Sequence, residues 1–262
     1  MTVINLFFGG LKIVSRILWF NLIFLDKNSD HFGQKLRLSL ESMGPMFIKF
    51  GQLLSTRTDL LSSNVAKELQ KLTDQCKPFD AYQSKKIIES ELGGSIEEFF
   101  EYFDESPFAA ASLAQVHKAT LKNTSQKVVI KILRPNIKRE VEKNVKLLKS
   151  FASIFSITFK ESDRLKPLEV VRDYEKTIFR ELDLKLEASN TNLTRKNFSG
   201  SKILYIPEVY WDLSTSKILV LEEIEGIPCT DIDKIDAAGV DKKKLAENGV
   251  QIFLDQVFRD NF

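Results

Sequence analysis

The first 28 residues contain a long apolar run with polar positions along one side. Residues 3–25 are mostly aliphatic or aromatic, while Asn5, Gly9, Lys12 and Arg16 recur at helical spacing and share one narrow stripe. This pattern predicts an amphipathic helix that lies in a membrane surface. A helix that covers the protein's own core is an equally open interpretation. A membrane span is disfavoured because both basic residues are costly at the bilayer centre, and no small-residue cleavage site indicates a secretory signal.

Apolar positions recur every three or four residues over residues 29–95, which is the period of amphipathic helices. A glycine–proline pair interrupts this period. Because proline is favoured in the first helical turn, a new helix is predicted to begin at Pro45. It carries Lys49, Gly51 and Gln52, and the lysine and the glutamine lie three residues apart on one face. We therefore predict a helical extension over residues 29–95.

In the middle of the chain, the helical period gives way to an alternation of side chains between two faces, as in strands. Residues 116–122 alternate as in a two-faced strand, and residues 128–133 form a second predicted strand after a polar turn. Lys131 is the single lysine in this second, otherwise apolar run. Such a lysine usually extends its ammonium group to solvent at an edge. A Val-x-Ile-Lys strand is also the element with which protein kinases hold the α- and β-phosphates of ATP.

Helical periods return over residues 137–159 and 167–197, and one long helix is predicted for each. The second predicted helix contains Glu187. A kinase-like site needs a helix carboxylate that pairs with the strand lysine and fixes it against the phosphates. A lysine in an apolar strand also needs a partner where it is partly buried. We therefore predict an ion pair between Lys131 and Glu187.

Two further strands are predicted over residues 206–210 and 217–221. The second is followed by an acidic stretch with Glu222 and Ile224, in the position of a hinge. A last helix is predicted over residues 242–260.

The order of these elements predicts an α+β fold. A protein-kinase-like small lobe with an antiparallel sheet is expected over residues 96–225, after the helical extension. The start of a large lobe is expected over residues 226–262, and it is incomplete.

Composition narrows the class of protein. Hydrophobic residues make up 43% of the chain and charged residues 28%, as in a globular protein, and 38 basic against 36 acidic residues argue against a nucleic-acid partner. Cys76 and Cys229 lie far apart, which predicts no disulfide framework and a reducing cytoplasm. The two histidines, His31 and His117, form no cluster with cysteine, so no metal site is predicted.

Three segments taken together resemble the UbiB family of atypical kinases, which act in ubiquinone (coenzyme Q) biosynthesis. Residues 49–52 (KFGQ) are similar to the family's Lys-x-Gly-Gln signature. Residues 109–117 (AAASLAQVH) are similar to its alanine-rich loop, which replaces the glycine-rich loop of other kinases. Residues 181–183 (ELD) are similar to its Glu-x-Asp motif. With the strand around Lys131 and the hinge, the resemblance extends over residues 30–262.

The resemblance implies ATP with magnesium as the cofactor and assigns roles by position. The residues implied to contact the nucleotide are Ala109, Ala110, Ala111 and Ser112 over the phosphates, Lys131 with its partner Glu187, and the hinge residues Glu222 and Ile224. The family's motif residues are Lys49, Gly51 and Gln52 in an extension that folds over the active cleft, and Glu181 and Asp183, which this lysine meets there. A lysine that plugs the cleft opposes peptide substrates, so the family resembles an ATPase or small-molecule kinase more than a protein kinase.

The implied partners are ATP, a membrane surface, lipids or quinone precursors, and other proteins of ubiquinone biosynthesis. The implied location is the cytoplasm, peripheral on the inner membrane.

The family's catalytic loop and metal-binding aspartate are expected beyond Phe262, so no catalytic residue is assigned. We expect the chain to be the front part of a longer protein, without ATP turnover alone, and whether it is an enzyme is left open. Two alternatives remain. One is an inactive product of a split or degraded gene, and the other is a non-catalytic module that binds nucleotide or membrane.

Overall fold

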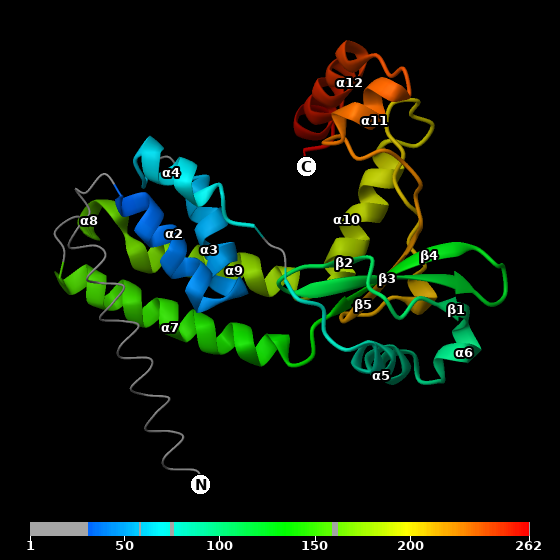
Figure 1. The fold of residues 1–262 in the computed structure, drawn as a ribbon, viewed down its shortest axis with the longest axis horizontal. Coiled ribbons are helices and arrows are strands. Elements are labelled where there is room, and N and C mark those ends of the chain that lie inside the picture. The colour runs from blue at the N-terminus through cyan, green and yellow to red at the C-terminus, as the bar shows by residue number, and fades with distance from the viewer. Residues whose placement is uncertain (1–30, 58, 74–75, 159–161, 262) are drawn as a thin grey trace, which may run out of the picture. The chain divides into compact units, whose positions relative to one another are not determined.

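The computed structural model describes residues 31–57, 59–73, 76–158 and 162–261 (Figure 1). The helix predicted for the first 28 residues lies outside these ranges. Helices combine with an antiparallel sheet, so the predicted α+β class is confirmed. Within the described ranges, no helix is long and apolar enough to cross a bilayer.

The described residues divide into two compact units. The first draws on the described residues up to Asp80, on Ala109–Gln115 and on those of 133–182; the second draws on Ala81–Phe108, Val116–Ile132 and residues 183–261. Each unit is thus assembled from separate stretches of the chain. The boundaries predicted at residues 95 and 225 remain predictions.

The first unit is mainly helical. Its elements are α2 (Phe32–Met43), α3 (Pro45–Ser55), α4 (Ser63–Leu69), β2 (Ala109–Ala110), α7 (Ile137–Thr158), α8 (Ser162–Leu165) and α9 (Pro167–Glu181). Helix α2 packs on α3 and α4, and α7 packs along α9 and against α3. The start of α3 at Pro45 is confirmed, and Gly44 before it adopts a φ of 102°, a conformation that favours glycine.

Aromatic side chains hold the centre of this unit together. Phe47 of α3 packs edge-on against Phe151 of α7, with 6.4 Å between ring centroids. Phe50 packs in the same way against Tyr174 of α9 at 5.2 Å. The buried Tyr174 hydroxyl donates to the Met46 carbonyl oxygen at 2.8 Å, so its polar atom is satisfied inside the core. Helices distant in sequence are thereby joined through α3.

The second unit contains most of the sheet. Its elements are α5 (Ala81–Leu92), α6 (Ile96–Phe99), β1 (Phe100–Phe103), β3 (Ala114–Leu121), β4 (Lys127–Leu133), α10 (Leu184–Asn197), the short 3-10 helix η1 (Trp211–Leu213), β5 (Ile218–Glu222), α11 (Ile232–Ala237), α12 (Lys242–Leu254) and the π-helical turn η2 (Asp255–Arg259). The strand order is β1-β3-β4-β5, and β2 pairs with β3. Strands β4 and β5 are antiparallel with Lys131 opposite Leu219 and Ile130 opposite Val220, which confirms the predicted strand pairing.

The single helix predicted over residues 167–197 is wrong. Helix α9 ends at Glu181, and α10 begins at Leu184. Asp183 between them has extended backbone angles, and its carboxylate accepts a hydrogen bond from the Lys185 N–H at 3.0 Å. Aspartate is a strong N-cap residue, so a new helix begins here although the apolar period continues.

The strand predicted over residues 206–210 is also wrong. The segment makes only an isolated bridge, between Val209 and Leu221 of β5. Pro207 has no N–H to give to a ladder. The following strand is confirmed as β5. Two backbone hydrogen bonds still join the segment to β5, from the Tyr210 N–H to the Val220 carbonyl oxygen and from the Glu222 N–H to the Glu208 carbonyl oxygen, both at 3.0 Å. The Tyr205 hydroxyl adds a side-chain contact by donating to the Glu222 carboxylate at 2.7 Å.

Candidate functional site

Lys131 and Glu187 form an ion pair in the second unit. The lysine Nζ lies 2.7 Å from each carboxylate oxygen, which confirms the predicted pair. Alternation along β4 explains the placement of the lysine: Val128, Ile130 and Ile132 are fully buried, so Lys131 extends from the opposite face of the strand. Glu187 lies in the first turn of α10, which Asp183 caps.

This pair contributes little to stability and leaves the ammonium group accessible. The side chains of Lys131 and Glu187 are 34% and 42% exposed. Ion pairs with this much solvent contact contribute at most about 1 kcal/mol. The carboxylate fixes the direction of the lysine, while the open side of the ammonium can meet an anion.

The Lys-x-Gly-Gln segment makes three different contacts within the first unit. Lys49 forms an ion pair with Glu181 at the end of α9, with 2.8 Å between Nζ and a carboxylate oxygen. The Gln52 amide donates to the Leu72 carbonyl oxygen at 3.1 Å. A Cβ atom on Gly51 would lie 2.4 Å from a methyl carbon of Leu72, so only glycine fits between them without a shift. The motif therefore fixes both α9 and the segment after α4.

The alanine-rich loop is held mainly through its backbone. Ala109 and Ala110 form β2, and the Ala111 N–H donates to the Ala114 carbonyl oxygen at 2.8 Å. Ser112 is buried. The methyl groups of Ala109 and Ala111 are exposed, so this loop offers a small, smooth surface that a ligand can approach closely.

The hinge residues lie at the end of β5: Glu222 is its last residue, and Ile224 comes two residues later. The Glu222 carboxylate accepts from the Tyr205 hydroxyl and from the Glu208 N–H at 3.1 Å, and Ile224 is exposed. The hydrogen bond to this carboxylate raises the pKa of Tyr205. No periodic pattern marks Tyr205, so sequence reasoning missed it; the signal available was an aromatic hydroxyl beside a strand-breaking proline. Glu222 therefore orders the segment before β5 as well as ending the strand.

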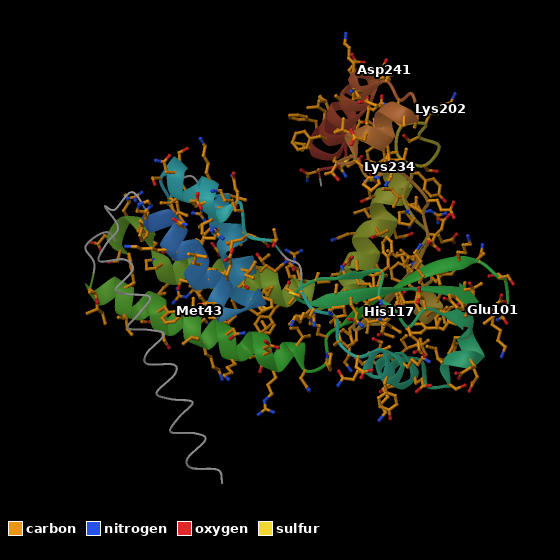
Figure 2. All side chains as sticks on the ribbon, viewed as in Figure 1. Met43, Glu101, His117, Lys202, Lys234 and Asp241 are labelled. Atoms are coloured by element: carbon orange, nitrogen blue, oxygen red, sulfur yellow. The ribbon has the colours of Figure 1, made fainter. Side chains whose placement is uncertain are left out.

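His117, within the alanine-rich motif, is buried in the sheet of the second unit (Figure 2). Its Nδ1 lies 2.8 Å from the Asp104 carbonyl oxygen and its Nε2 lies 3.1 Å from the Ser84 hydroxyl of α5. A carbonyl oxygen can only accept, so Nδ1 carries the proton and Nε2 of the neutral ring accepts from the serine. The ring also stacks on Phe103, with 4.8 Å between centroids. His117 thus joins α5 to the strands as a neutral group.

We predict that acid destabilises the protein through His117. Burial lowers the pKa of His117, against an opposing effect of its hydrogen bond to Asp104. The unfolded chain then binds more protons once the pH falls below about 6.5, the ordinary histidine pKa. The stabilisation is complete above that pH and is lost as the pH falls through the folded-state pKa. Urea unfolding at pH 7 and pH 5 measures the difference.

Two variants distinguish the contribution of His117 to the pH dependence of stability from the contribution of the carboxylates, which is common to all variants. His117→Gln is expected to show a smaller loss of unfolding free energy between pH 7 and pH 5 than the wild type. His31→Gln changes an exposed histidine just before α2 and should behave as the wild type. An identical pH dependence for His117→Gln and wild type would rule out this role for the buried ring.

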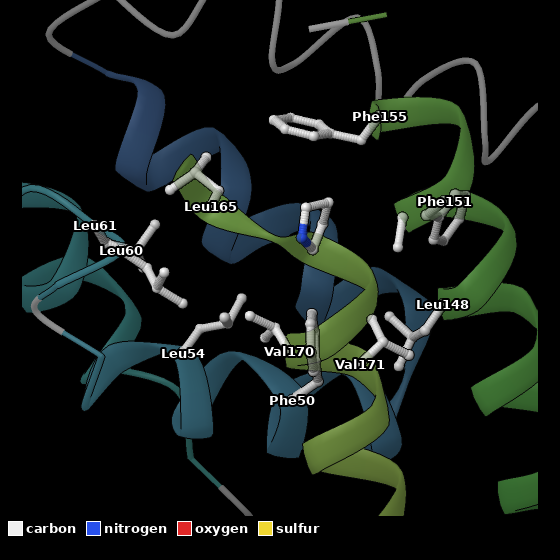
Figure 3. A pocket seen from close by; sticks show the side chains of 12 residues that line it. Phe50, Leu54, Leu60, Leu61, Leu148, Phe151, Phe155, Leu165, Val170 and Val171 are labelled. Carbon is white, nitrogen blue, oxygen red and sulfur yellow. The ribbon is translucent and has the colours of Figure 1, made fainter. Parts of the chain in front are cut away.

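An apolar cavity opens in the first unit between α3, α7 and α9 (Figure 3). Phe50, Phe151, Phe155 and Val170 lie around it, and every lining residue is aliphatic, aromatic or proline. Its volume of about 100 Å³ is below the roughly 150 Å³ of a cavity that holds benzene. The space suits the end of a hydrocarbon chain, and none of the described residues that line it has a polar side chain that could orient a head group.

Comparison with known proteins decides the family. A family model described as the ABC1 atypical kinase-like domain matches residues 71–262. The chain belongs to the ABC1 atypical kinase-like family. The resemblance to UbiB proteins that the motifs indicated is also confirmed, because proteins named "Probable protein kinase UbiB" match most of the chain.

The UbiB relatives of this ABC1 chain are similar over a long stretch. The protein from Vibrio campbellii (strain ATCC BAA-1116) is 48% identical over 230 residues, which cover 88% of this chain and 42% of the relative. Those from Marinobacter nauticus and Pseudomonas putida (strain GB-1) are 47% and 48% identical with the same coverage. The chain therefore spans less than half the length of the curated relatives it matches.

A solved structure shares the fold of this ABC1 chain. Its title is "The complex structure of Rv3197-erythromycin from Mycobacterium tuberculosis". The match has a TM-score of 0.50 and 23% identity, and it covers 76% of this chain and 45% of the solved one. This likeness supports the kinase-like architecture.

Proposed function

We propose that this chain is the nucleotide-binding part of a UbiB-type atypical kinase or ATPase that supports ubiquinone biosynthesis. The observation that carries the proposal is the ion pair between Lys131 of β4 and Glu187 of α10. Kinases use this arrangement to hold a lysine against the α- and β-phosphates of ATP. The family assignment makes the same use the best-supported role here, and the comparisons do not favour a degraded product or a purely regulatory module.

The residues present fit a nucleotide. The partly exposed Lys131 ammonium can meet a polyphosphate, and the Ala109–Ser112 loop can cover phosphates with small side chains. The position of Glu222 at the end of β5, with Ile224 just beyond it, supports a hinge beside adenine. Magnesium would neutralise phosphate charge when bound. Within the described residues no group of three or more acidic, histidine or cysteine side chains could hold a metal ion, so its ligands are not assigned.

Calorimetric titration of the 262-residue polypeptide with ATP tests the nucleotide role. Saturable binding of ATP that is much tighter than the binding of adenosine would support phosphate recognition. A folded polypeptide that binds neither ligand would refute it.

The ubiquinone role rests on the similarity to the UbiB proteins and is testable with a chimera. In the Vibrio campbellii relative, the aligned 230 residues are replaced by those of this chain. We expect this chimera to restore ubiquinone in a bacterium that lacks its own UbiB, as measured by chromatography of lipid extracts. The unmodified relative is the positive control. A chimera that accumulates to the same level but restores no ubiquinone would contradict the proposal.

We further propose a peripheral membrane location, with lipids or quinone precursors and other ubiquinone-biosynthesis proteins as partners. The apolar pattern of residues 3–25, with Lys12 and Arg16 on its polar stripe, supports contact with an anionic membrane surface. Each such cation contributes about 1 kcal/mol near the surface. The cavity between α3, α7 and α9 supports a hydrocarbon partner.

Flotation with anionic liposomes tests the membrane contact. The whole chain is expected to float with the vesicles, less completely at high salt because the charge attraction is screened. A chain without residues 1–28 is expected to remain in the protein fraction. Equal flotation of both forms would exclude this segment as the membrane contact. Loss of folding on deletion would favour the interpretation that the segment covers the protein's own core.

A further inference from the structure

Arg134 connects the alanine-rich loop to a distant segment of the first unit. Its Nε donates to the Ala111 carbonyl oxygen at 2.9 Å, and its Nη2 donates to the Lys77 carbonyl oxygen at 2.8 Å. One planar guanidinium thus joins two backbone positions that are 34 residues apart in sequence. The backbone N–H of Arg134 donates to the Leu113 carbonyl oxygen at 2.8 Å, so the arginine backbone is also fixed next to this loop.

A second connection runs beside the first. The side-chain amide of Gln115 accepts from the Phe79 N–H at 2.9 Å and donates to the Phe79 carbonyl oxygen at 3.2 Å. Gln115 is fully buried, so this pair of hydrogen bonds is shielded from water. The Arg134 guanidinium also lies over the Phe79 ring, 5.7 Å from its centroid.

Hydrogen bonds join these segments where regular secondary structure does not. Residues 76–79 form neither helix nor strand, and Lys77 is exposed. Beside the loop lies a cavity of about 390 Å³, lined by Ser112, Arg134 and Lys77 among others. A loop with open space on one side gains few van der Waals contacts there, so its shape depends on its polar contacts. Charge-assisted hydrogen bonds such as those of Arg134 are about twice as strong as neutral ones.

We propose that Arg134 is a positioning residue for nucleotide binding. It holds the Ala109–Ser112 loop in one shape by clamping it to the Lys77–Phe79 segment. This inference rests on the proposed function, in which that loop covers the phosphates. A loop that is already ordered loses less conformational entropy when a ligand binds. The clamp should therefore raise affinity for the phosphates without touching the nucleotide.

Two measurements on three variants of the full chain test the proposal. Arg134→Ala removes the clamp, and Arg134→Lys keeps the charge but cannot donate as a fork to two carbonyl groups. Arg139→Ala removes an exposed arginine five residues further on and serves as the matched control. Hydrogen exchange of residues 76–79 and 109–113 reports the clamp, and calorimetry with ATP and with adenosine reports its effect on binding.

For Arg134→Ala, exchange of both segments is expected to rise roughly tenfold, as the loss of one charged hydrogen bond implies. ATP affinity is expected to fall roughly three- to tenfold while adenosine affinity stays the same. Arg134→Lys should be intermediate and Arg139→Ala unchanged. An effect limited to ATP separates positioning from general destabilisation, which would weaken both ligands.

Two results would overturn the inference. Unchanged exchange in Arg134→Ala would show that no clamp exists. Faster exchange with unaltered ATP affinity would show that the clamp does not position the loop for nucleotide. Failure of the underlying function is distinguishable from both, because then the wild-type chain itself binds no ATP.

Discussion

ATP is expected to bind the Lys131→Ala variant roughly 10- to 100-fold more weakly than the wild-type chain. In the proposed role the lysine supplies the positive charge that the phosphates meet, and a hydrogen bond to a charged group contributes about 1.5–3 kcal/mol. Unfolding free energy should change by no more than about 1 kcal/mol, because the pair with Glu187 is partly exposed. Calorimetric titration with ATP and urea unfolding measure the two quantities separately.

Lys127→Ala is the matched control, since it removes a lysine from the same strand. Lys127 forms an ion pair with Glu225 at 3.4 Å, and both side chains are largely exposed. Its loss is expected to leave ATP affinity unchanged. Glu187→Gln should weaken ATP binding less than Lys131→Ala, because the ammonium remains but loses its fixed direction. Equal affinity of the Lys131→Ala and Lys127→Ala variants for ATP would show that Lys131 does not bind phosphate.

Replacing Phe47 by alanine is expected to lower the free energy of unfolding by about 3–5 kcal/mol. Phe47 is 1% exposed and packs on Phe151, so its removal leaves a cavity where α3 meets α7. The neighbouring Gly51 already brings this face of α3 into close contact with Leu40 and Leu72. The surrounding helices therefore have little freedom to fill the space. Urea unfolding followed by fluorescence and circular dichroism measures the effect.

The control is Phe253→Ala, which removes a phenylalanine of α12 that is 60% exposed. Substitutions at such surface positions usually change stability by less than about 0.5 kcal/mol. Because the protein has two compact units, the loss in Phe47→Ala is expected in the transition of the helical unit. If the helical unit of Phe47→Ala unfolded at the same urea concentration as that of the wild type, the packing of α3 against α7 would be contradicted.

Several features of the site follow from local pattern. Alternation in the second strand placed Lys131 away from the buried side of β4, because successive side chains of a strand point to opposite faces. Pro45 marked the start of α3, since a proline at that position loses no helical hydrogen bond. Assigning Glu187 as the partner of Lys131, 56 residues away, also needed the kinase pattern, and the structure pairs them. The nucleotide roles of these residues remain predictions.

Other local patterns misled. The apolar period continued through Asp183, but its carboxylate caps a new helix. The carboxylate accepts a hydrogen bond from a backbone N–H in the first turn of α10, which has no partner within the helix. Residues 206–210 looked like a strand, yet Pro207 cannot complete a ladder. In both places a single side chain outweighed the hydrophobic period, which averages over a window and registers no individual hydrogen bond.

The sequence by itself determined the family, the α+β class, the helix beginning at Pro45 and the strand that carries Lys131, because periodicity and short motifs are properties of neighbouring residues. Only the tertiary structure decided the clamp of Arg134 and Gln115 on residues 77–79, the burial of a neutral His117 against Ser84, and the contact of Gly51 with Leu72. These contacts join positions 21 to 57 residues apart. Patterns among neighbouring residues do not predict contacts over such distances in sequence. Each contact forms only where packing brings together a donor and an acceptor, or leaves a space of the right size.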